Sequence, residues 1–229
     1  MENLGKGKLG QERMKTRESG EVFLYLLTIA VAIYFGLVFS GIFAGRVDFW
    51  SLLSGGLMVF LIVALWGDPL FSKLIYGDFR EKPLAAVGLG VISAALLYLL
   101  FFVGNILLQK LFPSSLDNLV AIYNLKSGRS SLRIGLFLGL IIGPGEELLW
   151  RGWLQRHWSK RLGKIAGLIA VALLYSAVHL ASGNPVLVLA ALVGGLWWGY
   201  QYLRFNSLLS NVISHLLWDL VIFIALPFY

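Results

Sequence analysis

The sequence predicts an all-α integral membrane protein, a polytopic bundle of seven or eight transmembrane helices with one interfacial amphipathic helix. Of its 229 residues, 58% are hydrophobic and only 14% are charged, and the mean hydropathy is +0.79. A soluble domain of this size cannot bury so much apolar surface. Several uncharged runs are also long enough to cross a bilayer, which takes about 20 helical residues.

Seven runs of the chain have the length and composition of a transmembrane helix. The expected spans are residues 22–44, 49–66, 84–108, 131–160, 165–182, 185–203 and 207–228. Before them, residues 1–20 are polar and rich in lysine and arginine, so we expect a disordered cytoplasmic tail. Residues 21–229 are then a single helical domain, and the polar stretch after the second span is a loop.

A shorter amphipathic helix is expected between the third and fourth spans. Its apolar side chains recur with a helical period from Leu116 to Tyr123. Ser114 or Ser115 can cap its start, and Gly128 can end it. This helix either lies at the membrane interface over a site or is a plain connector.

Basic residues are distributed unevenly between the two sides of the expected bundle. With the N-terminus inside, 14 of the 19 Lys and Arg residues fall on inner segments. Positively charged loops stay in the cytoplasm, so we expect a cytoplasmic N-terminus. The same asymmetry accounts for the net charge of +7, and we expect no nucleic-acid partner.

The fourth expected span carries ionisable side chains in an otherwise apolar run. Glu146, Glu147 and Arg151 follow a Gly-Pro-Gly sequence at residues 143–145. A charge inside a span costs about 2.5–3.5 kcal/mol on insertion scales, so by default it marks a functional site. Glu147 and Arg151 share a helix face and can pair, whereas Glu146 points about 100° away. We expect the helix to break, with a new half-helix starting at Pro144 and its positive end near both carboxylates.

Two of the three histidines, His179 and His215, also lie inside expected spans, and Asp219 follows His215 by one helical turn. His157 lies in a basic turn and is interpreted as an ordinary interfacial residue. Each intramembrane histidine taken alone can equally be a structural residue that links helices by hydrogen bonds. The helical rise, however, allows Glu146 and His179 to meet at one depth, about 24 Å from the turn between their helices.

Such a set of side chains suits hydrolysis. A carboxylate can act as general base on water, a neutral histidine can orient that water, and another polar group can stabilise the developing oxyanion. The sequence has no cysteine, and the known serine-hydrolase and zincin signatures are absent. The same set could instead line a proton or solute path in a transporter, although no inverted repeat is evident.

Three motifs over roughly residues 130–225 resemble the CAAX prenyl protease and bacteriocin-processing family, also called CPBP or Abi. They are Glu146-Glu147-x-x-x-Arg151, Tyr175-x-x-x-His179 and His215-x-x-x-Asp219. One motif alone is a weak signal, but all three in order on separate spans are specific. Tyr175 stands where phenylalanine is usual, which we expect to be harmless, and Asp219 stands where the eukaryotic prenyl proteases have asparagine.

The resemblance implies an intramembrane endopeptidase that acts on a peptide or protein substrate, prenylated or not, in the plasma membrane of a bacterium. The roles that it implies are water activation by Glu146, water positioning by His179, a group facing the scissile carbonyl from His215 and Asp219, and support from Glu147 and Arg151. An ionised aspartate only accepts hydrogen bonds. We therefore expect Asp219 to orient His215 as a donor.

Other interpretations of the same residues stay open. Glu146, His179, His215 and Asp219 could bind zinc, although we favour a site that requires no metal or other cofactor. The chain could also be a proteolytically inactive relative, as a membrane scaffold or a bacteriocin-immunity protein, or a transporter. The sequence determines neither the natural substrate nor the oligomeric state.

Overall fold

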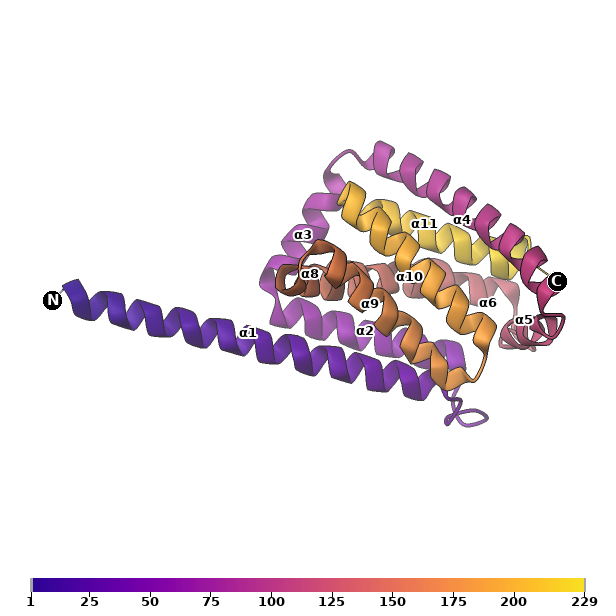
Figure 1. Ribbon diagram of the computed structural model, residues 1–229, viewed down its shortest axis with the longest axis horizontal. Helices are drawn as coiled ribbons and strands as arrows, with labels where there is room; N and C mark the ends of the chain where they lie inside the picture. The colour runs from indigo at the N-terminus through magenta and orange to yellow at the C-terminus, as the bar shows by residue number, and fades with distance from the viewer. Residues whose placement is uncertain (1, 229) are drawn as a thin grey trace.

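The computed structural model describes residues 2–228, with side chains from residue 20 onward, and these residues form helices joined by short turns (Figure 1). Six helical segments in this part of the chain are long and apolar enough to cross a membrane. They belong to α1 (Glu2–Phe39), α2 (Phe49–Gly67), α4 (Pro83–Leu111), α9 (Lys164–His179), α10 (Pro185–Phe205) and α11 (Leu208–Leu220). The predicted class, a polytopic helical membrane protein, is thereby confirmed.

The fourth expected span is a continuous helix whose winding changes along its length. α6 (Ser131–Leu136), α7 (Gly143–Glu146) and α8 (Arg156–Leu162) alternate with π-helical segments at Phe137–Ile142 and Glu147–Gln155. The expectation that a new half-helix begins at Pro144 is therefore wrong. A π turn moves the hydrogen bond from the fourth to the fifth preceding residue, and the backbone stays helical through the proline. Both carboxylates consequently lie within a helix and not at its N-terminus.

α1 begins at Glu2, so the expectation of a disordered tail is wrong for residues 2–20, whereas Met1 lies outside the described residues. The N-terminal half of this helix projects away from the bundle (Figure 1). A helix that is already formed in the span grows without a further nucleation cost. The sequence Gln-Glu-Arg-Met-Lys at residues 11–15 consists of good helix formers.

The polar stretch after α2, which we expected to be a loop, contains the helix α3 (Pro69–Arg80). Asp68 accepts a hydrogen bond from the Leu70 N–H at 3.1 Å, and Pro69 suits the first turn. Phe71 is fully buried, and Arg156 of α8 pairs with Asp68. Lys73 and Arg80 are on the exposed side of this helix, whereas Asp78 is half-buried and accepts a hydrogen bond from the Leu209 N–H at 2.7 Å.

α5 (Ser115–Asn124) is the amphipathic helix expected between the third and fourth spans. Leu119 and Tyr123 are buried. The expected cap differs in detail, because the Ser114 side chain makes no capping hydrogen bond. Gly128 adopts φ +74° at the end of the following turn.

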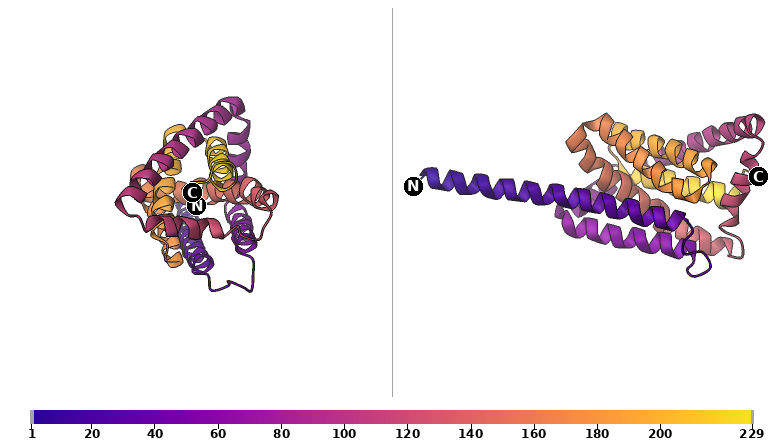
Figure 2. Two further views of the ribbon diagram at one scale, coloured as in Figure 1. Left: turned by 90° about the vertical axis from the view of Figure 1, so that its right-hand side faces the viewer. Right: turned by 60° about the horizontal axis from the view of Figure 1, so that its bottom comes forward.

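Glycines let the helices of the site approach one another closely. A Cβ atom on Gly143 would lie 3.1 Å from the backbone of Leu216 in α11, and one on Gly195 of α10 would lie 3.3 Å from the Tyr175 ring. α10 packs beside α9, and α11 beside α4. α1 and α2 run side by side along another side of the bundle (Figure 2).

Asp48 connects the start of α2 to the turn that precedes α6. Its carboxylate accepts hydrogen bonds from the Ser51 N–H at 3.0 Å and from Arg129 Nε at 2.5 Å. Burial acts to raise the pKa of Asp48, but the Ser51 N–H and the Arg129 guanidinium outweigh it and lower this pKa below its usual value of 3.8. The ionised form of Asp48 therefore stabilises the fold.

We expect Asp48→Asn to lower the free energy of unfolding by about 0.5–1 kcal/mol at neutral pH, because the amide loses the charge that faces Arg129. A lowered pKa contributes stability above the ordinary pKa of the group, and this contribution is lost as the pH falls through the folded-state pKa. The difference in melting temperature between wild type and variant should therefore narrow on titration towards acid. A difference that stays constant over the whole titration would contradict this interpretation.

Candidate active site

All six residues singled out in the sequence lie in the interior of the bundle. None has more than 5% of its surface exposed: Glu146, Glu147, Arg151, His179, His215 and Asp219. They come from three helical segments, namely the run that contains α7, then α9 and α11. Buried charges are costly unless they are paired and hydrogen-bonded, so their partners determine what the site can do.

Glu147 is the centre of the first group. Its Oε1 accepts hydrogen bonds from Arg151 at 2.9 Å and from His215 Nδ1 at 2.7 Å, and its Oε2 accepts one from Asn211 at 2.9 Å. The pair expected between Glu147 and Arg151 is thereby confirmed. Because a carboxylate only accepts hydrogen bonds, Nδ1 of His215 carries a proton.

The Arg151 guanidinium is accommodated by several further contacts. Its Nη2 donates to the carbonyl oxygens of Gly194 and Gly195 at 3.4 and 3.3 Å. It also lies over the rings of Tyr175 and Trp198, at 5.0 and 5.5 Å from their centroids. Together with Glu147, these contacts offset part of the cost of burying the charge.

The His215 imidazole is positioned by a hydrogen bond at one edge and by a stacked ring on one face. Glu147 binds Nδ1, and the Trp198 ring stacks on the imidazole at 3.7 Å between centroids and 17° between planes. Trp198 is itself fixed, because its Nε1 donates to Ser214 Oγ at 3.0 Å. The orientation of Nε2 is therefore determined by the surrounding fold.

Tyr175 connects the members of the second group, Glu146 and His179. Its hydroxyl donates to Glu146 Oε2 at 2.5 Å, and its backbone carbonyl accepts from His179 Nδ1 at 2.7 Å. Since a carbonyl only accepts, Nδ1 of His179 carries the proton, and Nε2 of the neutral ring is an acceptor. Tyr175 thus fixes the positions of two hydrogen-bond acceptors, the Glu146 carboxylate and Nε2 of His179.

His215 lies between the two groups. Its Nε2 is 3.9 Å from Glu146 Oε2 and 3.8 Å from Asp219 Oδ2, beyond hydrogen-bond distance in both cases. The orienting hydrogen bond that we expected from Asp219 is therefore not formed, and Glu147 makes it instead. The reason is geometric, because Asp219 faces the Nε2 edge of the ring while Glu147 faces the Nδ1 edge. Oδ2 of Asp219 is buried without a hydrogen-bond partner among the described residues.

A cavity of about 550 Å³ adjoins these groups. Glu146, Tyr175, His179, His215 and Asp219 line it, and most of the other lining residues are apolar. Such a cavity, apolar with a few convergent polar groups, is typical of a ligand-binding site.

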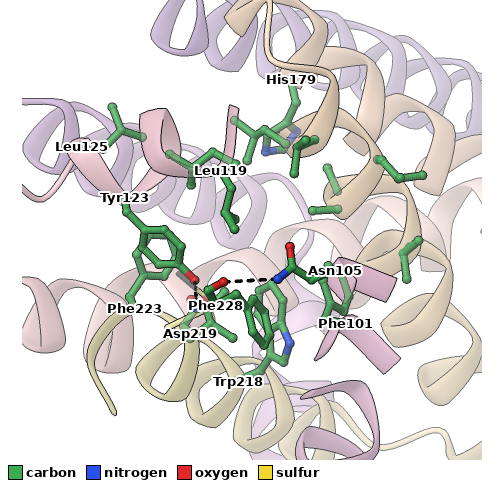
Figure 3. A pocket seen from close by; sticks show the side chains of 18 of the residues that line it. Phe101, Asn105, Leu119, Tyr123, Leu125, His179, Trp218, Asp219, Phe223 and Phe228 are labelled. Carbon is green, nitrogen blue, oxygen red and sulfur yellow. Dashed lines mark hydrogen bonds between the residues drawn. The ribbon is translucent and has the colours of Figure 1, made fainter. Parts of the chain in front are cut away.

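α5 supplies part of the wall of this cavity. Leu119 and Tyr123 from α5 face the cavity, while Trp218 and Asp219 from α11 line another part of it (Figure 3). Of the two interpretations of the amphipathic helix, the structure supports the one in which it covers the site.

Zinc was the alternative interpretation of Glu146, His179, His215 and Asp219. Within the described part of the chain, no group of three or more His, Asp and Glu side chains is arranged to hold a metal ion. The residues as placed therefore do not form a metal site, and we derive no step through a metal. The favoured interpretation, a site that requires no metal, stays a prediction to be tested by experiment.

Three contributors to the site were missed in the sequence. The hydroxyl of Tyr175, a substitution expected to be harmless, contacts Glu146. Asn211 precedes His215 by one helical turn, and that spacing could have indicated it. Trp198 has no comparable signal, because the stacking on His215 depends on how α10 packs beside α11.

The fold and the site define a polytopic helical membrane protein with buried carboxylates and imidazoles beside an apolar cavity. Residues 128–221 match the family described as type II CAAX prenyl endopeptidase Rce1-like, and this segment contains all six site residues. This part of the chain, less than half of its length, is similar to that CAAX protease family. No curated protein and no solved structure matches the chain.

Proposed function

We propose that the chain is an intramembrane endopeptidase that hydrolyses a peptide bond of a membrane-associated or prenylated substrate, with Glu146 activating the water. The observation that carries this proposal is the connection of Glu146 and His179 through Tyr175 on one wall of an apolar cavity. The family match supports a peptidase in general terms. A buried carboxylate of this kind can act as the base in hydrolysis.

In the first step, Glu146 takes a proton from a water molecule in the cavity. Nε2 of His179 accepts a hydrogen bond from the second hydrogen of the same water. The water oxygen then attacks the carbonyl carbon of the substrate, and a tetrahedral intermediate with an oxyanion forms. Holding the water between two fixed acceptors removes the entropic cost of finding the correct orientation.

In the second step, the oxyanion is stabilised and the peptide bond breaks. Nε2 of a protonated His215 donates to the oxyanion, while Glu147 and Arg151 keep the ring in place. Glu146 returns its proton to the amide nitrogen, so the C–N bond breaks and a carboxylic acid and an amine leave. Asp219 faces the same edge of His215 and attracts its positive charge.

The proposed activity takes place in a membrane. The apolar helices and the family indicate an integral membrane protein. We propose that the chain lies in the plasma membrane of a bacterium with a cytoplasmic N-terminus, since most basic side chains fall on that side. The substrate is a peptide or protein at the membrane, and neither a nucleic acid nor a cofactor is required.

Cleavage of peptides by the purified protein tests the proposal. The protein in detergent is incubated with a library of membrane-anchored peptides, each with and without a prenyl group, and the products are identified by mass spectrometry. We expect internal cleavage with a defined site preference. A folded preparation that cleaves no peptide in either form would contradict the proposal.

We expect Asp219→Asn to lower activity but to retain an appreciable part of it. The amide loses the attraction to the charged His215 ring, but Asp219 makes no hydrogen bond to that ring, and an amide can still accept from, or donate to, groups in the cavity. If Asp219 were a zinc ligand, the variant would lose metal and activity together. Metal content and activity are measured on both proteins after chelator treatment. Stoichiometric zinc in the wild type, with activity lost on chelation and regained with zinc, would overturn the metal-free mechanism.

A further inference from the structure

A short non-helical segment of the chain lies beside the cavity of the site. The π-helical turn Val221–Ala225 follows α11, and the backbone then leaves the helix at Leu226, which has φ −140° and ψ 67°. The Phe228 side chain lines the cavity and stacks on the ring of Tyr98 with 5.2 Å between centroids. Non-helical backbone of the chain itself therefore lies beside the cavity of the proposed active site.

Two polar side chains bind the backbone of Phe228. Its N–H donates to the Tyr123 hydroxyl, and its carbonyl oxygen accepts from the Asn105 amide, both at 3.2 Å (Figure 3). Gln109 donates to the other end of the Asn105 amide at 3.1 Å, which directs the amide nitrogen towards the peptide. Tyr123 and Asn105 come from α5 and α4, and both line the same cavity as Glu146 and Asp219.

We propose that Tyr123 and Asn105 form a peptide-backbone subsite of the cavity, and that residues 226–228 are an internal peptide that a substrate displaces. Recognition of both the N–H and the carbonyl of one residue is independent of its side chain, as binding of varied peptides requires. This inference rests on the proposed peptidase function and adds to it the way in which the substrate backbone is held.

The contacts of the internal peptide are few enough for exchange. Among the described residues they comprise two hydrogen bonds to side chains, one ring stack and a hydrogen bond from the Tyr98 hydroxyl to the Leu226 carbonyl at 3.4 Å. The Phe228 ring also packs against the hydrophobic cluster that contains Leu97 and Trp218. Leu226 itself is 57% exposed. A substrate that makes the same backbone hydrogen bonds replaces those that it breaks, so the exchange requires little net free energy.

The test measures binding and not turnover, so that it does not depend on catalysis. The probe is a fluorescent peptide with the sequence Ala-Leu-Pro-Phe between lysines, and its dissociation constant is measured by anisotropy on the full-length Glu146→Gln protein in detergent. Phe228→Pro removes both the ring that stacks on Tyr98 and the N–H that Tyr123 accepts. Phe228→Tyr keeps both and is the matched control.

We expect Phe228→Pro to tighten binding of the probe, because the internal peptide no longer competes for the subsite. Tyr123→Phe or Asn105→Leu is then added to the Phe228→Pro protein. In the wild-type background each substitution would weaken binding of the probe and of the competing residues 226–228 together, so its effect on probe binding would be masked. In the Phe228→Pro protein each should weaken binding about two- to tenfold, the effect of one hydrogen bond. Tyr200→Phe, at an exposed tyrosine on α10, is the control for the loss of a hydroxyl.

Two outcomes would overturn the inference. Unchanged binding in a folded Phe228→Pro protein would show that residues 226–228 do not compete with the probe. Unchanged binding when Tyr123→Phe and Asn105→Leu are added would show that these side chains only anchor the chain. A protein that binds the probe as expected but cleaves no peptide would instead contradict the proposed hydrolysis and leave the subsite intact.

Discussion

Glu146→Gln should abolish peptide hydrolysis and leave the fold intact. The amide has the shape of the carboxylate and can still accept the hydrogen bond from the Tyr175 hydroxyl, but it cannot take a proton from water. Loss of a general base typically lowers the rate by about 10²–10⁴-fold. The measurement is the initial rate of cleavage of the best library peptide, together with thermal unfolding in detergent.

Glu81→Gln is the matched control, since it makes the same change at an exposed glutamate beside the end of α3. We expect it to keep the wild-type rate. Full activity in the Glu146→Gln protein would remove Glu146 from the mechanism. A loss of activity that accompanies a much lower melting temperature would have to be attributed to folding.

Glu147→Ala and Arg151→Ala should each destabilise the protein strongly. Removing one member of a buried ion pair leaves the other charge without compensation, at a cost of about 3–5 kcal/mol. Glu147→Ala also removes the acceptor for His215 and for Asn211. We therefore expect lower melting temperatures for both variants, and for Glu147→Ala an additional loss of activity in the folded fraction.

Arg161→Ala provides the comparison with an exposed pair. Arg161 and Glu21 lie 2.9 Å apart, with more than a third of each side chain exposed, so the substitution should change the melting temperature little. If Glu147→Ala and Arg151→Ala lost activity while melting like the wild type, the two residues would act in the chemistry and not as its support.

The sequence predicts the parts of this molecule that depend on local spacing. The helical spans follow from uncharged runs of sufficient length, and the pairing of Glu147 with Arg151 follows from their separation by four residues. The helical rise also allows Glu146 and His179 to meet at one depth, and both line the cavity. In each case the relevant geometry lies within one helix or follows from the helical rise.

What could not be predicted depends on how helices pack against one another. Spacing alone suggested that Asp219 binds His215, because the two residues share a helix face. The ring nitrogen instead binds Glu147 from another helix. Similarly, Gly-Pro-Gly indicates a helix break locally, yet the surrounding helices keep the segment helical with π turns on either side. Packing therefore overrides local preference at the residues that form the site.

The close approach of Gly143 to Leu216 has a consequence for how mutational scans of this protein are interpreted. Gly143 comes one turn before Glu147, and Leu216 follows His215, so this contact sets the separation between the carboxylate and the imidazole. A methyl group at position 143 would meet backbone atoms, which cannot move aside as a side chain can. We therefore expect substitutions at Gly143, which has no reactive group, to lower activity as well. In a mutational scan, the positions at which substitutions lower activity will therefore include the contact between Gly143 and α11 as well as the catalytic residues.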